Sequence, residues 1–212
     1  MVVLACGCSS GSNGNDAPTT TTETTAPPTV STRPPVTAST TTTTIPNPLE
    51  PLILKDAPSG FPRQDDSFAA TGPVDLDKAV LDDPFGSAQA ARRTLLAAGF
   101  VRGYQRQWTV EPGVNQNFVY VYQFATPEGA ASYLTHWRAA AVAGAFRSAP
   151  VPFTPILPGA TGLKANDPRG SSGVVLFSKG PYAVQSVVTG PAGVNQSEPA
   201  TELAFAQYAL LP

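Results

Sequence analysis

Alternating apolar and polar positions in the second half of the chain predict two long β-strands in succession. Over 101–110, Tyr104, Arg106 and Trp108 fall on one face and polar side chains fall on the other. Over 118–124, aromatic residues occupy one face and valines the other. Apolar side chains on both faces are typical of a central strand, and the turn between the two segments predicts antiparallel pairing.

Helical periodicity and start signals predict helices around these strands. Ser87 is expected to cap a helix that ends at Gly99, and Thr126 to cap a second helix that runs to about Val142. A short helix is expected at 75–81, and Ser197 is expected to cap the last helix. Three more strands are predicted at 161–165, 174–179 and 182–189, the last two forming a hairpin across Gly180-Pro181.

These elements together predict an α+β fold with a curved antiparallel sheet of about five strands and helices packed mainly on one face. The helix after Thr126 has an apolar face formed by Tyr133, Leu134 and Trp137. We expect this helix to cover the sheet face that carries Trp108, so that Trp108 is buried.

Composition divides the chain into three parts. Residues 1–8 are interpreted as the remnant of a secretion signal, and residues 9–48 are rich in Thr and Pro and contain no aromatic side chain. Such a segment cannot bury enough apolar surface to offset the cost of ordering it, so a disordered tether is predicted. Residues 49–212 carry all the Trp, Tyr and Phe side chains and are expected to form a single α+β domain.

The first residues run from apolar to small side chains and then to cysteine, as Val3-Leu4-Ala5-Cys6-Gly7-Cys8. This pattern resembles the lipobox of bacterial lipoproteins, which implies lipidation of Cys6, with Cys8 as the alternative. The lipobox, the Thr/Pro-rich stalk and the Ala-rich domain resemble surface lipoproteins of high-GC Gram-positive bacteria. A more distant likeness is to small α+β envelope domains of the sensor type. The resemblance implies a protein anchored at the extracytoplasmic face of the cell membrane.

Composition also limits the chemistry that the domain can carry. The net charge of −2 argues against a nucleic-acid partner, and no apolar run reaches 18 residues. Both cysteines fall in the first eight residues, and His136 is the single histidine, expected on the solvated flank of its helix. No metal site and no cofactor are therefore predicted. Gly113-Val114-Asn115-Gln116 recurs as Gly193-Val194-Asn195-Gln196, but four shared residues are within chance.

One aromatic constellation has two interpretations. Tyr104, Arg106 and Trp108 on the first strand are expected to lie across from Tyr120 and Tyr122 on the second. If helices cover that face, these residues are core, which is the interpretation that we favour. If the face is open, they form an aromatic platform with one cation, suited to sugars, glycan chains or lipid.

The leading functional hypothesis is a lipid-anchored, non-catalytic envelope domain. Its expected partners are the membrane, through the lipid, together with cell-wall glycan, lipid or an envelope protein. Two alternatives stay open. One is a hydrolase of cell-wall or lipid substrates that uses a pair of carboxylates. The other is a structural accessory subunit of an envelope complex, which would expose an apolar patch.

Overall fold

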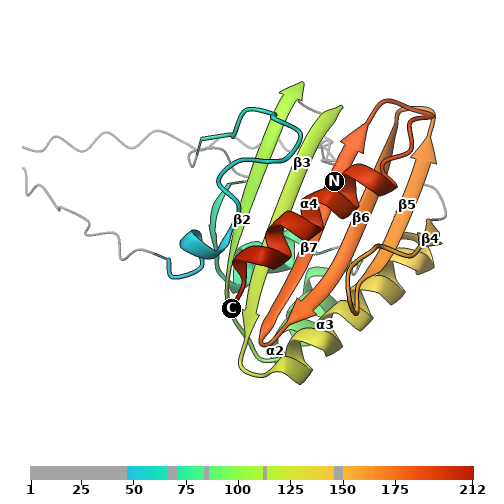
Figure 1. The fold of residues 1–212 in the computed structure, drawn as a ribbon. Helices are drawn as coiled ribbons and strands as arrows, with labels where there is room; N and C mark the ends of the chain where they lie inside the picture. The colour runs from blue at the N-terminus through green and yellow to red at the C-terminus, as the bar shows by residue number, and fades with distance from the viewer. Residues whose placement is uncertain (1–46, 66–70, 84–85, 112–113, 146–149) are drawn as a thin grey trace, which may run out of the picture. The chain divides into compact units, whose positions relative to one another are not determined.

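One antiparallel sheet organises the part of the chain that the structure describes, a computed structural model covering residues 47–65, 71–83, 86–111, 114–145 and 150–212 (Figure 1). Cys6, Cys8 and residues 9–46 of the predicted tether lie outside these ranges. Within them the sheet has seven strands in the order β1-β2-β3-β7-β6-β5-β4. The strands are β1 (Gly72–Val74), β2 (Phe100–Glu111), β3 (Asn115–Phe124), β4 (Val151–Phe153), β5 (Thr161–Asp167), β6 (Gly170–Lys179) and β7 (Tyr182–Gly190).

The sheet confirms the predicted α+β class and extends the predicted strand number. β3 lies between β2 and β7, which confirms the prediction of a central strand. The two strands beyond the expected five are β1 and β4, three-residue strands at opposite edges of the sheet. Each has a proline at its centre, Pro73 and Pro152, and proline is tolerated at sheet edges because it has no N–H to donate.

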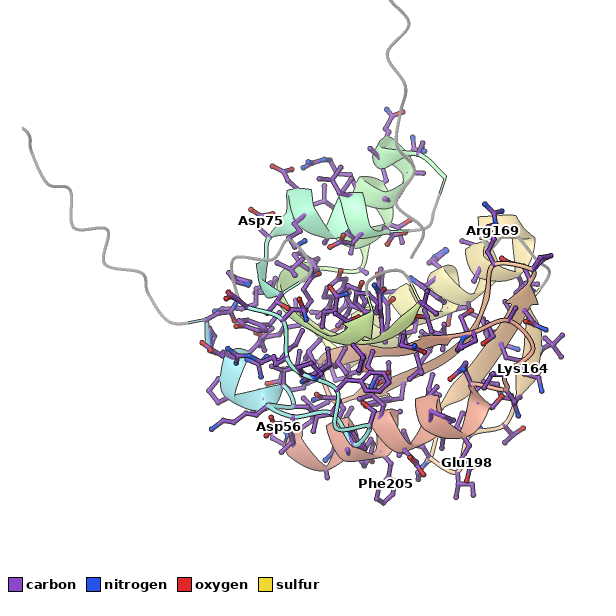
Figure 2. All side chains as sticks on the ribbon, turned by 90° about the horizontal axis from the view of Figure 1, so that it is seen from above. Asp56, Asp75, Lys164, Arg169, Glu198 and Phe205 are labelled. Atoms are coloured by element: carbon purple, nitrogen blue, oxygen red, sulfur yellow. The ribbon has the colours of Figure 1, made fainter. Side chains whose placement is uncertain are left out.

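Three of the four described helices pack on one face of the sheet, as the prediction of helices mainly on one face expects, and the fourth packs on the opposite face (Figure 2). The first face is packed under α1 (Leu76–Asp82), α2 (Ala88–Ala97) and α3 (Pro127–Ala140), and a single π-type turn (Ala141–Ala145) follows α3. We call it the helical face. The second face is covered by α4 (Ser197–Leu210) and by the irregular residues 47–61, which contain the 3₁₀ turn η1 (Glu50–Leu52). We call residues 47–61 the strap and this second face the strap face.

The register of β2 and β3 places their aromatic residues on opposite faces. Tyr104 pairs with Val121 and Trp108 pairs with Asn117, so even-numbered positions of β2 lie beside odd-numbered positions of β3. A shift of one residue reverses every side chain, and the expected pairing was wrong by that one residue. Trp108 therefore packs on the strap face, and α3 packs on the helical face.

Two of the three predicted helix caps are confirmed. The Ser87 hydroxyl accepts a hydrogen bond from Ala90 N, and the Thr126 hydroxyl accepts one from Gly129 N. Ser197 is instead the first residue of α4, and its own N–H and hydroxyl donate to the side chain of Asn195. At the other end of α4, the Lys179 ammonium lies 2.6 Å from the Leu211 carbonyl oxygen and satisfies it.

Candidate functional site

The five residues of the predicted platform are all buried and do not share a surface. Tyr120 and Tyr122 lie under the helices of the helical face, with 8 % and 2 % of their area exposed. Tyr104, Arg106 and Trp108 lie under the strap, with 2 % or less exposed. The expectation that Trp108 is buried is confirmed, but the strap covers it rather than α3. The structure thus contradicts an exposed platform built from these five residues.

Arg106 and Trp108 bind the backbone of the strap. Arg106 Nη1 donates to the Leu54 carbonyl at 2.6 Å and lies 3.4 Å from the Ile53 carbonyl. Trp108 Nε1 donates to the Lys55 carbonyl at 3.1 Å. An irregular segment that covers a core has carbonyl groups that no neighbouring strand can pair with. Arg106 and Trp108 supply hydrogen-bond donors to three consecutive carbonyls of the strap, from residues 53 to 55.

The side chain of Gln207 on α4 holds the same segment from the other side. Its Nε2 donates to the Leu52 carbonyl at 2.7 Å, and its Oε1 accepts from Leu54 N at 3.0 Å. The strap also inserts Leu49 and Ile53 into the core, each only 1 % exposed. Two of the side chains that the sequence pattern suggested for an external ligand, Arg106 and Trp108, therefore hold an irregular segment of the chain itself.

A pocket of about 240 Å³ lies between the end of the strap and the first turns of α4. Three parts of the chain form it: the end of the strap, the neighbouring ends of β3 and β7, and the first turns of α4 with the loop before it. The lining residues are Pro58, Ser59, Phe61, Asn115, Asn117, Val188, Thr189, Gln196, Pro199, Glu202 and Leu203. We call this the strap pocket.

Asn117 in the strap pocket has an unmet hydrogen bond. The residue is 2 % exposed, and its Nδ2 donates to the Ser59 hydroxyl at 2.6 Å. Among the described residues, its Oδ1 is buried and has no hydrogen-bond partner. A buried amide oxygen without a donor costs about 1–3 kcal/mol, so a group that supplies a donor here would gain that energy.

Gln196, which lines the strap pocket, lies close against the sheet because two strand residues have no side chain. A Cβ at Gly173 would collide with the Gln196 carbonyl oxygen, and a Cβ at Gly190 would collide with the Gln196 amide. The Gln196 amide also donates to the Ser171 hydroxyl at 3.3 Å. These contacts fix the loop before α4 in the lining of the pocket.

The two copies of the Gly-Val-Asn-Gln segment meet at the strap pocket. Asn115 of the first copy and Gln196 of the second both line it. The Thr189 hydroxyl, also in the lining, donates to the carbonyl of Val114 in the first copy at 2.8 Å. The repeat was therefore the available sequence signal for this site, although it is too short to stand out from chance.

The helical face carries the most strongly perturbed ionisable groups. Burial raises the pKa of Tyr122 and of Tyr133 well above their usual value; nearby Asp82 adds to the effect at Tyr122, and Tyr122 and Asp83 add to it at Tyr133. The Tyr133 hydroxyl donates to Asp83 at 3.2 Å and accepts from the Gln185 amide at 3.0 Å. Burial also raises the pKa of Asp82, more than Lys78 at 3.3 Å lowers it. These groups form a buried network in the core and line neither pocket.

The remaining candidate chemistry is sparse in the described ranges. A second depression of about 250 Å³ lies by edge strand β4, lined by Arg138, Pro152, Phe153, Thr154, Ala160 and Thr161. Of these two pockets, only the strap pocket holds a carboxylate, Glu202, so neither offers the carboxylate pair of the hydrolase alternative. His136 is exposed on α3.

The same described residues hold neither a metal-ligating cluster nor a helix suited to crossing a membrane. No three His, Cys, Asp or Glu side chains gather there as a metal would require. Within those ranges, no helix has both the length and the apolar character needed to cross a membrane.

Comparison with known proteins does not identify a family. No family model matches the chain, and no curated protein does. Among solved structures, the extracellular domain of PknH from Mycobacterium tuberculosis is similar at 10 % sequence identity and a TM-score of 0.38, over 55 % of this chain and 69 % of that one. At this TM-score the likeness is too low to assign a shared fold or function.

Proposed function

We propose that this protein is a lipid-anchored, extracytoplasmic, non-catalytic binding domain that takes its ligand in the strap pocket. The lipobox pattern at Cys6 supports the anchor, and the Thr/Pro-rich composition of 9–48 supports a tether that holds the domain away from the membrane. The observation that carries the binding function is Asn117, which lines the strap pocket and whose buried amide oxygen has no donor among the described residues.

The lining of the strap pocket supports binding more than it supports catalysis. It combines apolar side chains with three amides, two hydroxyls and one carboxylate, the kind of mixed surface that fixes a ligand in one orientation. Acid–base or nucleophilic chemistry needs a second titratable group beside the first, and Glu202 is the one titratable side chain in this lining.

The anchor is tested by membrane fractionation of the full chain expressed behind a functional lipoprotein signal in a bacterial host. Cys6→Ala should abolish incorporation of labelled palmitate and release the protein from the membrane fraction. Cys8→Ala is the matched control and should leave both unchanged. Loss of labelling in Cys8→Ala alone would move the anchor to Cys8, and retention of labelling in both variants would refute lipidation at either cysteine.

The binding function is tested by nuclear magnetic resonance of the non-lipidated full chain. Three probe classes are added separately: neutral saccharides, anionic phospholipid vesicles and short extended peptides. Binding at the strap pocket predicts saturable shifts of the side-chain amide signals of Asn115, Asn117 and Gln196 with at least one class. Shifts confined to other regions, or no shift with any class, would refute the strap pocket as the binding site.

A further inference from the structure

We infer that the ligand of the strap pocket is an uncharged ring that bears hydroxyl groups, that is, one unit of a saccharide. This inference rests on the proposed function and names its ligand class. Four properties of the pocket support this ligand class: the charge of its lining, its hydrogen-bonding groups, its apolar groups and its volume.

The charge of the lining disfavours anions. Its eleven residues include the carboxylate of Glu202 and no lysine or arginine. A phosphate or carboxylate ligand would meet a like charge with no compensating cation in the lining, whereas an uncharged ligand would not. Lipid headgroups and acidic sugars are therefore poorer matches than a neutral saccharide.

The hydrogen-bonding groups match a partner that both donates and accepts. Asn117 Oδ1 needs a donor. The Ser59 hydroxyl already accepts from Asn117 Nδ2 at 2.6 Å and from Phe61 N at 3.3 Å, so its own proton is directed elsewhere and needs an acceptor. A ligand hydroxyl can give its proton to the first group and accept the proton of the second. A saccharide presents several such hydroxyls on one ring.

The apolar part of the lining and the volume both fit a single ring. Phe61 lies at the wall, half-buried, and can pack against the C–H face that a sugar ring presents between its hydroxyls. At about 240 Å³ the pocket is smaller than the roughly 300–1,000 Å³ that holds drug-sized ligands. One ring with its chain continuing into solvent fits this volume better than a lipid tail or a long peptide.

The experiment is a titration of the non-lipidated full chain with matched neutral and acidic sugars, glucose against glucuronic acid and N-acetylglucosamine against N-acetylmuramic acid. Binding is followed by the amide signals of Asn117 and Gln196 and by calorimetry. We expect the neutral member of each pair to bind about five- to tenfold more tightly, the effect of one nearby like charge. Ser59→Ala should weaken neutral-sugar binding by about the same factor, since it removes one hydrogen bond.

Glu202→Gln tests the charge argument directly. It keeps a polar side chain of the same shape and should remove most of the discrimination against the acidic sugars. Glu198→Gln is the matched control, because Glu198 is exposed like Glu202 and lies one turn earlier on α4 but does not line the pocket (Figure 2). The control should bind both members of each pair as the unmodified protein does.

The outcomes separate the inference from the proposed function. Shifts at Asn117 and Gln196 with peptides or phospholipid but not with sugars would overturn the saccharide assignment and leave the binding function standing. Equal binding of neutral and acidic sugars would also overturn the assignment, because the charge argument would then fail. No shift with any probe would overturn both. Co-sedimentation with purified cell walls, competed by the free neutral sugar, would identify a wall polysaccharide as the source; binding of free sugar without co-sedimentation would identify a soluble one.

Discussion

The two faces of the sheet are equally buried but are closed in different ways. On the helical face, Tyr122 is 2 % exposed and packs ring to ring with Tyr133 of α3, their centroids 5.8 Å apart. On the strap face, Trp108 is completely buried under a segment with little regular structure. Helices satisfy their own backbone groups, so apolar contact is enough to hold them on a sheet, whereas an irregular segment also needs partners for its carbonyls.

This difference explains the role of three polar or aromatic side chains on the strap face. Arg106, Trp108 and Gln207 supply the donors that the carbonyls of the strap need. The strap pocket opens on the same face, where the strap ends and α4 begins. A buried arginine in a strand pattern can therefore mark the place where irregular backbone lies on a sheet, and need not mark a ligand.

Removing residues 47–57, most of the strap, should have the largest effect on stability. A chain that begins at Pro58 loses Leu49 and Ile53, and each deletion of a buried aliphatic side chain costs about 2–5 kcal/mol. That sum is comparable with a total stability of about 5–15 kcal/mol, so we expect no cooperative unfolding transition. The control begins at Asn47, keeps the Asn47 hydrogen bond to Gly103 at 3.0 Å and should melt as the full chain does. Equal melting of the two truncated chains would show that the strap contributes little.

Trp108→Ala should be the most damaging single substitution on the strap face. It removes a completely buried ring and should lower the free energy of unfolding by about 3–5 kcal/mol, measured by urea denaturation. Trp108→Phe, the matched variant, keeps an aromatic ring and loses the hydrogen bond to Lys55, so its loss should be clearly smaller. A loss below about 1 kcal/mol for the alanine variant would mean that Trp108 is not a core residue.

Arg106→Met should loosen the strap without emptying the core. The methionine fills much of the same space but leaves the Leu54 carbonyl without its charged donor, a loss of about 1.5–3 kcal/mol. Hydrogen exchange should rise at the backbone amide of Leu54 and stay unchanged in β6 and β7. Arg93→Met removes the same charge from an exposed position on α2 and should change neither stability nor exchange. An exchange increase spread evenly over the sheet would contradict local loosening.

The smallest effect concerns the helical face and depends on pH. Burial raises the pKa of Asp82 above its usual value, so folding favours its protonated form. The stability that this residue contributes is complete below the unfolded pKa and is lost as pH rises through the folded pKa. Asp82→Asn should therefore melt about 1–3 °C higher than the unmodified chain at pH 7, with the difference vanishing near pH 3. A lower melting temperature at pH 7 would mean that the ion pair with Lys78 outweighs burial.

Local pattern was sufficient for most elements of the fold. The alternation in β2 and β3, the apolar character of both faces of β3 and the start signals at Ser87 and Thr126 each depend on neighbours in sequence. The register between β2 and β3 was not predictable, because both faces of β3 are apolar and either pairing buries apolar side chains. The edge strands β1 and β4 were missed because three residues with a central proline show no alternation.

The strap and the strap pocket could not be predicted from sequence periodicity, for a different reason. Residues 47–61 have no periodicity that says which surface they cover, and their partners Arg106 and Gln207 are distant in sequence. Asn115, Asn117 and Gln196 are brought together only when β3 and β7 pair and the loop before α4 lies against Gly173. A single sequence does not indicate which polar residues of loops and strand ends come together in the folded protein.

The contact between Gln207 and the strap also orders events during synthesis. Leu52 and Gln207 are 155 residues apart. At a synthesis rate of about 5–20 residues per second, the strap therefore leaves the ribosome roughly 8–30 s before Gln207 does. Throughout that interval Leu49 and Ile53 have no α4 to pack beside, and the strap stays open to proteases and chaperones. In a nascent chain halted before α4, the first cut within the domain would therefore fall in 47–61, and the start of the domain is among its last parts to become protected.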